Sequence, residues 1–345
     1  MARFEVDLTA FATNLVTIRT TVAPAVHMLV VKDDAYGHGL AAIVPAARVG
    51  GVRWFGTFDV ATAVAVRALT GPAPRIVAWT VYNAGEIDLA LAHDIDLGLG
   101  THELITATAA VGARTGHAAR VHLKVDTGLH RNGIRPEGWA AAVAAAEHAQ
   151  RAGALSIEGV WSHIAEASDE ADDRARDEFF TAVDAFEQAP PLRHLAASAA
   201  AFARPGFQLD LVRIGAFAYG IRPSDGPSDA ELGIRPIGTL IASVTDVATD
   251  AVTVDVGSLD GLDSRLAGRL QVGTPAGPRP VTAIGPVSAQ VAAWPGAAVG
   301  DDVALFGGRA PASATDVAEM LHTIGEEVVL RISPRLPRRY LSAAA

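Results

Sequence analysis

Short apolar runs alternate with amphipathic segments of helical period along the first two thirds of the chain. Each apolar run is bounded by glycine, proline or charge, and the runs cover residues 27–32, 53–58, 75–80, 94–100, 121–126, 155–163, 193–198 and 211–220. The helical patterns between them lie at 59–69, 85–92, 102–112, 137–152 and 172–188. Strands that alternate with helices in this way predict a (β/α)₈ barrel. An open doubly wound sheet is the alternative that the pattern alone leaves open.

The pattern changes near residue 225. The segment SDGPSDAELG at 224–233 is rich in turn residues and is typical of a linker. Short alternating segments separated by glycine and proline follow, at 239–247, 251–258, 269–273, 279–291, 301–307 and 328–335. They predict an all-β domain with one helix, at 315–324, whose N-cap is Thr315. We therefore expect an α/β barrel domain at 8–224 and a β domain at 225–345. The strand at 1–7 is expected to belong to the β domain.

Composition and charge narrow the classes of function. The 345 residues contain no cysteine, which excludes disulfides, thiolate metal sites and a cysteine nucleophile. The formal net charge of −10 disfavours nucleic acid as a partner. The start, MARFEVDLTAFATNL, mixes charges into its apolar positions, and no long uncharged apolar run follows. We therefore expect no signal peptide, no membrane span and a cytoplasmic location.

Polar residues stand at the ends of several predicted barrel strands. A charge that is buried there needs a partner or a functional role. Because the carboxyl ends of barrel strands form the mouth of the active site, we expect the site to include Lys32, Lys124, Asp126, His163, Ser198 and Arg213. Lys32 follows the most apolar run and opens the segment KDDAYGHG. A lysine in a desolvated pocket loses its proton readily and can form a Schiff base with an aldehyde. Taken alone, Lys32 also fits a salt-bridged strand end.

Six segments occur in a fixed order along almost the whole chain: MLVVKDDAYGHG (28–39), HLKVDTGLHRNGI (122–134), GVWSHIAEA (159–167), HLAASAA (194–200), DLVRIGAFAYG (210–220) and RISPRLPRRY (331–340). Together they resemble the motifs of the alanine racemase family, pyridoxal-phosphate enzymes of fold type III. The first segment departs clearly from the family pattern only at Asp33, where alanine is usual. The resemblance implies an isomerase that interconverts L-alanine and D-alanine with pyridoxal 5'-phosphate as its cofactor.

The resemblance also implies where the cofactor is held. Lys32 would carry the internal aldimine and move the α-proton on one face of the substrate. The phosphate group would be bound by Tyr36, Ser198, the backbone of Gly215 and Ala216, and Tyr340. Backbone N–H groups at a glycine-containing turn suit a dianion.

Further roles concern the pyridine ring and the substrate. His163 would lie against the ring, and Arg213, supported by His194, would donate to the ring nitrogen. Arg131 would lie near the substrate carboxylate. Lys124, seven residues before Arg131, matches a lysine that is carbamylated in some members and orients that arginine.

Arg213 bears on the type of reaction. Arginine does not give up its proton at neutral pH, so it would leave the pyridine nitrogen unprotonated and weaken the electron sink. Less delocalisation of the carbanion means fewer side reactions, which fits an enzyme that only moves a proton. The alternative is that Arg213 pairs with Asp210 or Asp126 as a structural ion pair.

The part of the site that the partner subunit supplies in the family departs from the pattern. There, a tyrosine on the second domain carries the proton on the opposite face of the α-carbon. The four tyrosines of this chain are Tyr36, Tyr82, Tyr219 and Tyr340, and none lies between 221 and 339. The segment 242–250 runs directly into 251–262, so the loop that would carry the catalytic tyrosine is missing, and Ser258 replaces a second family tyrosine.

Other partner-side positions are also altered. Ala289 stands where the family has a methionine near the substrate carboxylate, and 324–327 reads IGEE in place of I-N-Y-E. The candidates for a replacement acid–base are His322, Asp255, Asp260 and Asp263, each of which also fits an exposed or structural residue.

Three functions remain open at this point. The first is an amino-acid racemase that uses Lys32 with an unidentified second acid–base, or alone at reduced efficiency. The second is a non-racemase pyridoxal-phosphate enzyme of the same fold acting on another amino acid, since Ala197 and Ala289 are smaller than the family residues. The third is a catalytically degenerate pyridoxal-phosphate-binding protein. The resemblance implies a small amino-acid substrate, no metal, and a homodimer with shared active sites.

Overall fold

The computed structural model describes residues 1–342. Its chain forms two compact units, each built from more than one stretch of sequence. We call residues 19–32 and 47–215 the barrel unit. Residues 1–18, 33–46 and the chain from 216 onward form the β unit.

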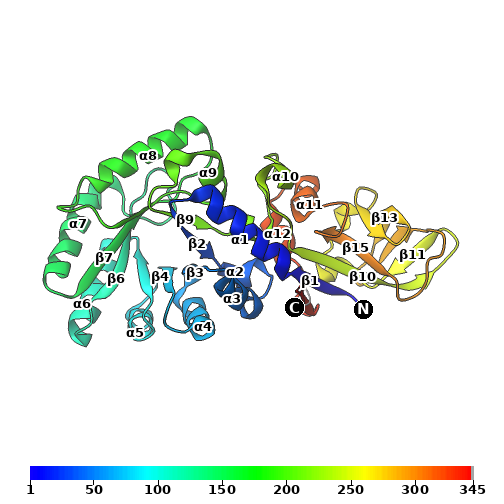
Figure 1. The fold of residues 1–345 in the computed structure, drawn as a ribbon, viewed down its shortest axis with the longest axis horizontal. Coiled ribbons are helices and arrows are strands. Elements are labelled where there is room, and N and C mark those ends of the chain that lie inside the picture. The colour runs from blue at the N-terminus through cyan, green and yellow to red at the C-terminus, as the bar shows by residue number, and fades with distance from the viewer. Residues whose placement is uncertain (343–345) are drawn as a thin grey trace. The chain divides into compact units, whose positions relative to one another are not determined.

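The barrel unit contains an eight-stranded parallel sheet in the order β8-β7-β6-β5-β4-β3-β2-β9 (Figure 1). Its strands are β2 (Val26–Val30), β3 (Trp54–Asp59), β4 (Arg75–Thr80), β5 (Asp96–Leu99), β6 (Ala119–Lys124), β7 (Leu155–Trp161), β8 (Leu192–His194) and β9 (Leu211–Ile214). The end strands are joined, since the backbone N–H of Asp210 donates to Arg193 O (3.2 Å) and that of Arg213 to Ala196 O (3.1 Å). The closed sheet confirms the predicted (β/α)₈ barrel and excludes the open sheet.

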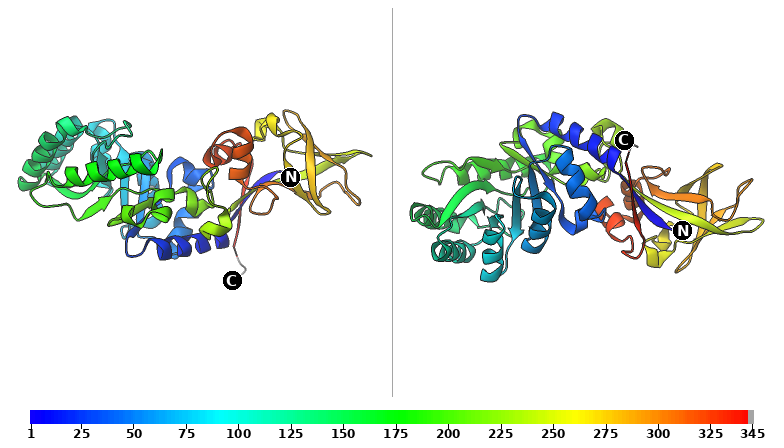
Figure 2. Two further views of the ribbon diagram at one scale, coloured as in Figure 1. Left: turned by 90° about the horizontal axis from the view of Figure 1, so that it is seen from above. Right: turned by 60° about the horizontal axis from the view of Figure 1, so that its bottom comes forward.

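Helices follow the barrel strands in alternation and lie around the outside of the sheet (Figures 1 and 2): α4 (Val60–Thr70), α5 (Ala84–Ala92), α6 (His102–Thr115), α7 (Pro136–Arg151) and α8 (Asp169–Val183). Four of them begin at a side chain that accepts a backbone N–H, namely Asp59, Asn83, Thr101 and Ser168. Because helices cover the sheet, its strands are largely buried and apolar. Met28, Val77 and Leu211 form one cluster of this core.

The β unit contains a second eight-stranded sheet in the order β11-β14-β13-β12-β15-β10-β1-β16. Figure 2 shows its long strands from two sides. The strands are β1 (Arg3–Asp7), β10 (Gly238–Val247), β11 (Ala251–Val254), β12 (Gln271–Thr274), β13 (Gly277–Ile284), β14 (Ala289–Ala292), β15 (Asp302–Gly307) and β16 (Arg338–Leu341). Pairing is antiparallel except between β1 and β16, so the N-terminal strand lies between β10 and β16 in this sheet.

The remaining helical segments are short, apart from α1. They are α1 (Leu8–Val22), α2 (Lys32–Tyr36), α3 (Leu40–Val49), α9 (Ser198–Ala203), α10 (Asp229–Leu232), α11 (Ala314–Leu321) and α12 (Gly325–Leu330). Single 3-10 turns of three or four residues occur at η1 (Pro205–Phe207), η2 (Ala216–Tyr219), η3 (Ser258–Asp260) and η4 (Ser264–Leu266). Within residues 1–342, no helix is long and apolar enough to cross a membrane.

The helices of the β unit differ from the prediction in three places. Helix α11 begins at Ser313, whose side chain accepts the Asp316 N–H, so the predicted N-cap Thr315 is wrong. Both residues are good caps, but only Ser313 completes a capping box with Asp316. Residues 328–330 belong to α12 rather than to a strand, because buried Val328 and Val329 lie on one side of a helical turn. The predicted linker also contains the short α10.

Candidate active site

The side chains predicted to carry the chemistry of the barrel unit lie at the carboxyl ends of its strands. Lys32 follows β2 and Lys124 ends β6. His163 follows β7, Ser198 follows β8 and begins α9, and Arg213 lies within β9. Because all eight strands are parallel, these ends meet at one mouth of the barrel.

An unusual backbone turn follows Lys32. Asp33, Asp34 and Ala35 have φ between 52° and 55°, and Tyr36 continues in the same left-handed region. Residues other than glycine adopt this region at a cost of roughly 1–2 kcal/mol each. Such strain concentrates where a site requires a particular geometry, and here it sets the direction of the chain between Lys32 and Tyr36.

Arg213 is buried and its guanidinium donates to carbonyl oxygens and imidazole nitrogens. Nη1 lies 3.0 Å from His194 O and 3.4 Å from His194 Nδ1. Nη2 lies 2.9 Å from Ser162 O, 2.9 Å from Leu195 O and 3.1 Å from His163 Nδ1. The charge of Glu166 also acts on Arg213 and opposes the effect of burial on its pKa. The hydrogen bonds given above all go to neutral carbonyl and imidazole groups.

The alternative partners of Arg213 are engaged elsewhere. Asp210 accepts the Arg193 side chain, with Nε 2.7 Å from Oδ2. Asp126 accepts two backbone N–H groups, of Gly128 and His130, and the His130 ring nitrogen at 2.9 Å. Arg213 is therefore not half of a structural ion pair with either carboxylate. Asp126, predicted as a site residue, orders the loop that leads to Arg131.

Positive charges converge at the mouth of the barrel. Burial, together with the charges of Arg213, Arg131, Lys124 and Lys32, lowers the pKa of His163 to about 3. Burial, with the charges of Arg213 and Arg131, lowers the pKa of Lys124 to about 8. Burial also lowers the pKa of Arg213 to about 9, so it still keeps its proton at neutral pH. His163 is consequently a neutral imidazole among cations.

Lys124 and Trp161 support this cluster. The Lys124 ammonium donates to Arg131 O at 2.9 Å and lies 4.6 Å from the centre of the Trp161 ring. The Arg213 guanidinium lies 5.1 Å from the same ring, and His194 stacks on it with the planes 4° apart. The aromatic face therefore stabilises two buried cations. Arg131 itself is exposed.

The β unit places two predicted phosphate ligands among aromatic rings. Tyr36 is buried, and its ring centre lies 4.8 Å from that of Tyr219. The Tyr340 hydroxyl lies so close to Gly39 that a Cβ at this position would collide with it. Gly39 also has a φ of 96°, so both space and backbone conformation require glycine there. Ala216 begins η2, directly after Gly215.

The four candidates for a replacement acid–base are bound to structural partners or exposed. Asp255 accepts the N–H groups of Ala2 and Ser243, and Asp260 accepts that of Gly257. Asp263 pairs with Arg265 at 2.8 Å. His322 is the exposed residue that ends α11. The three carboxylates thus have structural partners.

The connection that lacks the family's loop is a tight hairpin. Strands β10 and β11 are joined through Ala248–Asp250, and the Ala248 N–H donates to Ala251 O at 2.9 Å. Ser258 is exposed, and Ala289 is buried at the start of β14. No room exists in this connection for a loop that carries a tyrosine.

The residues present fit pyridoxal phosphate, a cofactor with an anionic phosphate and a ring nitrogen that accepts a hydrogen bond. The barrel mouth has two lysines and two arginines around His163. Lys32 and Lys124 are also the only lysines of the whole chain, so both amines occur in this cluster. The chemistry of these donors therefore matches what the cofactor requires.

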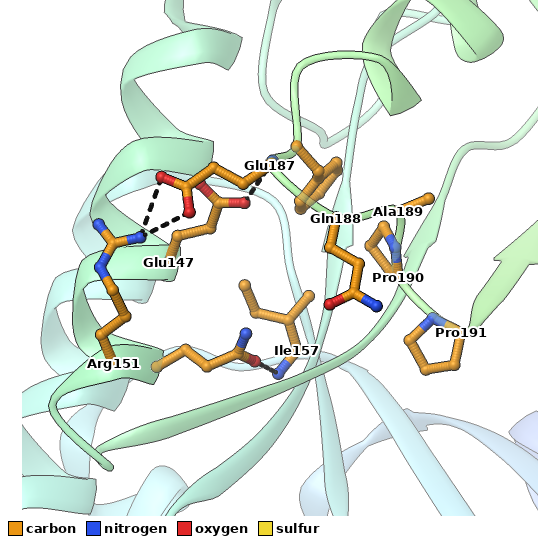
Figure 3. Close-up of a pocket in the computed structure, with 10 residues that line it drawn as sticks. Glu147, Arg151, Ile157, Glu187, Gln188, Ala189, Pro190 and Pro191 are labelled. Atoms are coloured by element: carbon orange, nitrogen blue, oxygen red, sulfur yellow. Dashed lines mark hydrogen bonds and ion pairs between the residues drawn. The ribbon is translucent and has the colours of Figure 1, made fainter.

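Figure 3 shows a cavity elsewhere in the barrel unit, of about 500 Å³, beside the amino end of β7 and the segment before β8. Its charged groups bind one another. Arg151 Nη1 lies 3.1 Å from Glu187 Oε1, and Glu147 accepts the Glu187 N–H at 2.8 Å. The Gln150 side chain accepts the Ile157 N–H at 2.7 Å. None of the predicted site residues lines this cavity.

Sequence reasoning missed three residues next to Arg213 and His194: Trp161, His122 and Asp96. His122 and Lys124 are two residues apart in β6, so they share one face of the strand. That spacing was the available signal for His122. The sequence contained no signal that Asp96, at the start of β5, lies next to it.

Comparison with known proteins gives one result along the whole chain. The family model described as "Alanine racemase, N-terminal domain" matches residues 6–223, and "Alanine racemase, C-terminal domain" matches residues 236–340. The alanine racemase of Thermobifida fusca is 35% identical over 377 aligned positions, which cover 99% of this chain and 98% of the relative. That of Beutenbergia cavernae is 34% identical over 98% of this chain and 97% of the relative.

Solved structures agree with these relatives. The alanine racemase from the D-cycloserine-producing Streptomyces lavendulae has a TM-score of 0.91 and 31% identity, over 99% of this chain and 97% of the other. The enzyme from Streptomyces coelicolor A3(2) has the same TM-score and identity, over 99% and 98%. The alignment with the Thermobifida fusca enzyme has 377 positions, whereas this chain has 345 residues. The alignment must therefore open gaps in this chain, as expected where segments of the relatives are absent.

Proposed function

The chain belongs to the alanine racemase family, and from that membership we propose that Lys32 moves the α-proton of a small amino acid, alanine being the first candidate. The family is a family of isomerases that depend on pyridoxal 5'-phosphate. The relatives are named racemases throughout, which favours racemisation over another reaction or a binding role.

Bound pyridoxal phosphate supplies the electron-accepting ring that makes the α-proton of an attached amino acid acidic. This chain supplies the groups around it. We assign the proton transfer to Lys32, the donor at the ring nitrogen to Arg213, and the neutral ring support to His163. The phosphate is assigned to Tyr36, Ser198, Gly215, Ala216 and Tyr340, and the substrate carboxylate to Arg131.

One observation carries the proposal. Arg213 is 5% exposed, keeps its charge, and donates to carbonyl oxygens and imidazole nitrogens at the carboxyl ends of the strands, with Lys124, Arg131 and Lys32 also acting on the neighbouring His163. A cluster of cations buried in this way is costly unless a ligand completes its surroundings. A cofactor with an acceptor nitrogen in its ring and an anionic phosphate would do so.

The opposite face of the α-carbon distinguishes this chain from the pattern of its family. The tight β10–β11 hairpin has no tyrosine, and three candidate carboxylates are engaged with other partners. We propose that Lys32 is the principal side-chain base, and that exchange of the α-proton on its face is faster than inversion. Positioned acid–base catalysis contributes about 10²–10⁴-fold, so loss of one base should slow inversion by a factor in that range.

Lys124 is a second amine with a specific role. Its pKa is lowered to about 8 and it lies among cations, both of which favour reaction of the free amine with CO₂ to an anionic carbamate. We propose this carbamylation, with Arg131 as the group that it orients. Carbon NMR in ¹³C-bicarbonate tests it, and because the chain has only two lysines, Lys124→Met identifies the signal.

We also propose a homodimer with shared active sites, a cytoplasmic location and domain limits of 8–224 and 225–345 with strand 1–7. The isologous dimer is the commonest oligomer. Sedimentation of the protein, with and without the cofactor, tests the homodimer.

The decisive experiment combines a spectrum with isotope exchange. The purified protein with pyridoxal phosphate should absorb at about 420 nm, and borohydride should fix the cofactor to Lys32. Proton NMR in D₂O then follows L-alanine and D-alanine separately. Exchange on one enantiomer that outpaces inversion supports the proposal; absence of the band, or a label on Lys124 alone, rejects it.

A further inference from the structure

A line of buried polar side chains leads away from Arg213 through the interior of the barrel. His194 Nδ1 lies 3.4 Å from Arg213 Nη1, and His194 Nε2 lies 3.0 Å from His122 Nδ1. His122 Nε2 lies 3.5 Å from Asp96 Oδ2. His122 and Asp96 are both 0% exposed and His194 is 1% exposed. Four strands, β9, β8, β6 and β5, thus contribute one residue each.

The chemistry of arginine fixes the direction of each hydrogen bond. Arginine only donates, so His194 Nδ1 must accept. Burial and the charges of His122 and Arg213 lower the pKa of His194 well below its usual value, so it is a neutral ring with its proton on Nε2. His194 then donates to His122 Nδ1, which leaves a proton on His122 Nε2, the atom that lies 3.5 Å from Asp96 Oδ2.

Asp96 gives this line a fixed end. Its carboxylate accepts Arg120 Nε at 2.6 Å and Arg75 Nε at 3.0 Å. Burial alone would raise the pKa of Asp96, but the interactions with His122, Arg75 and Arg120 bring it below its usual value. The carboxylate is therefore ionised and held in place, and it can only accept from His122.

We propose that His122 and Asp96 are positioning residues of the active site, which fix the tautomer and orientation of His194 and, through it, the plane of the Arg213 guanidinium. The inference rests on the proposed function of Arg213 at the cofactor ring. If His122 offered no acceptor, His194 could turn or shift its proton to Nδ1, where it would face the Nη1 protons. Arg213 would then lose one of the contacts that orient its guanidinium.

The same barrel contains a matched control. His27 lies in β2, is 7% exposed, and neither of its ring nitrogens has a hydrogen-bond partner in residues 1–342. Burial lowers its pKa to about 4, so it is neutral as well. A buried imidazole without partners is thus tolerated in this barrel, and His27→Leu controls for the loss of an imidazole from its core.

The experiment compares holoenzymes of His122→Leu, His122→Asn and His27→Leu with the wild type. Asparagine can place its side-chain oxygen near the Nδ1 position, so it restores the acceptor that leucine lacks. We expect His122→Leu to lower kcat for α-proton exchange by roughly 10- to 100-fold with little change in KM, as for other small misplacements of a catalytic group. His122→Asn should recover most of this loss, and His27→Leu should resemble the wild type.

The second readout is the absorption band of bound pyridoxal phosphate and its change with pH. A change in the contact at the ring nitrogen should alter this band in His122→Leu and not in His27→Leu. If the leucine variant does not fold, His122→Phe keeps a ring of similar size without an acceptor. Equal spectra and rates for the His122 and His27 variants would overturn the proposal. Failure of the wild type to form the band would instead reject the proposed function.

Discussion

The two ends of the barrel bury arginine with different partners. At the amino ends of the strands, Arg75 and Arg120 both bind Asp96, and Arg193 binds Asp210. At the carboxyl ends, Arg213 is buried and donates to carbonyl oxygens and two histidines, while the charge of Glu166 also acts on it. Both ends belong to the same sheet, so the difference does not come from the fold.

The arginines at the amino ends are balanced by carboxylates of the protein. The charge of Arg213 at the carboxyl ends is available to a ligand. A buried ion pair with satisfied hydrogen bonds is complete, and breaking it costs stability. A buried arginine that is held mainly by neutral carbonyl and imidazole groups gains a strong partner only when an acceptor or an anion binds. We therefore expect substitutions of the arginine at the carboxyl end to affect mainly activity, and substitutions of the arginines at the amino end to affect mainly stability.

The largest effect should come from Lys32. Lys32→Ala removes the proposed proton carrier, and we expect α-proton exchange to fall by about 10³-fold. Exchange is measured by proton NMR in D₂O with each alanine enantiomer. Because Lys124 is the only other lysine, Lys124→Met is the matched control: borohydride should still label that variant and should not label Lys32→Ala. Labelling in the opposite pattern would assign the chemistry to Lys124.

Arg213 should come next. Arg213→Met removes the donor proposed for the ring nitrogen, and we expect the exchange rate to fall by roughly 10²-fold, as for removal of one positioned donor. The protein should remain folded, since the hydrogen bonds of Arg213 go to neutral carbonyl and imidazole groups. Activity and urea unfolding are measured on the same preparation, with Arg193→Met as the control at the other end. Unfolding at the assay temperature would show that Arg213 is structural.

Arg120 tests the amino end. Arg120→Ala leaves Asp96 Oδ1, which it binds at 2.6 Å, without that partner, and we expect the free energy of unfolding to fall by about 3 kcal/mol. Arg75 still binds Asp96, so activity per folded molecule should change little. Arg193→Ala should cost less than about 1 kcal/mol, because its pair with Asp210 is partly exposed. A loss of activity without a loss of stability would contradict the division between the two ends.

The sequence predicted the barrel because each strand is a separate apolar run and each of five helices has a clear amphipathic pattern. It also predicted that Lys32, His163 and Arg213 lie where apolar strands end, and the structure has them there. Their chemical roles stay predictions. The N-cap Ser313 and the helix α12 were missed, since capping and helix formation there depend on tertiary packing of short segments.

The line from Arg213 to Asp96 could not be predicted for a different reason. Asp96 and His122 are 26 residues apart, in different strands, and each looks like an isolated polar residue in its own run. Only the pairing of β5 with β6 brings them together. Neighbour relations between strands are a property of the closed sheet, and one sequence without relatives does not reveal them residue by residue.

The smallest effect concerns Lys124 and pH. Its pKa is lowered from the usual 10.5 to about 8 in the folded protein, so between these values the unfolded chain binds more protons at this residue. Stability should therefore rise with pH across this window. Arg213, whose pKa is lowered to about 9, contributes in the same direction in its upper part. The charge of Lys124 is unfavourable below pH 8, where Lys124→Met should be the more stable protein.

The measurement is urea unfolding of the wild type and Lys124→Met between pH 7.5 and about 9.5 in buffer freed of CO₂. We expect the wild type to gain stability relative to the variant over this range by an amount on the order of 1 kcal/mol. Adding bicarbonate should reduce the gain, because a carbamate at Lys124 removes the cation at low pH as well. A constant difference between the two proteins would show that Lys124 does not titrate in this window, and the charge imbalance at the barrel mouth would then rest on the arginines alone.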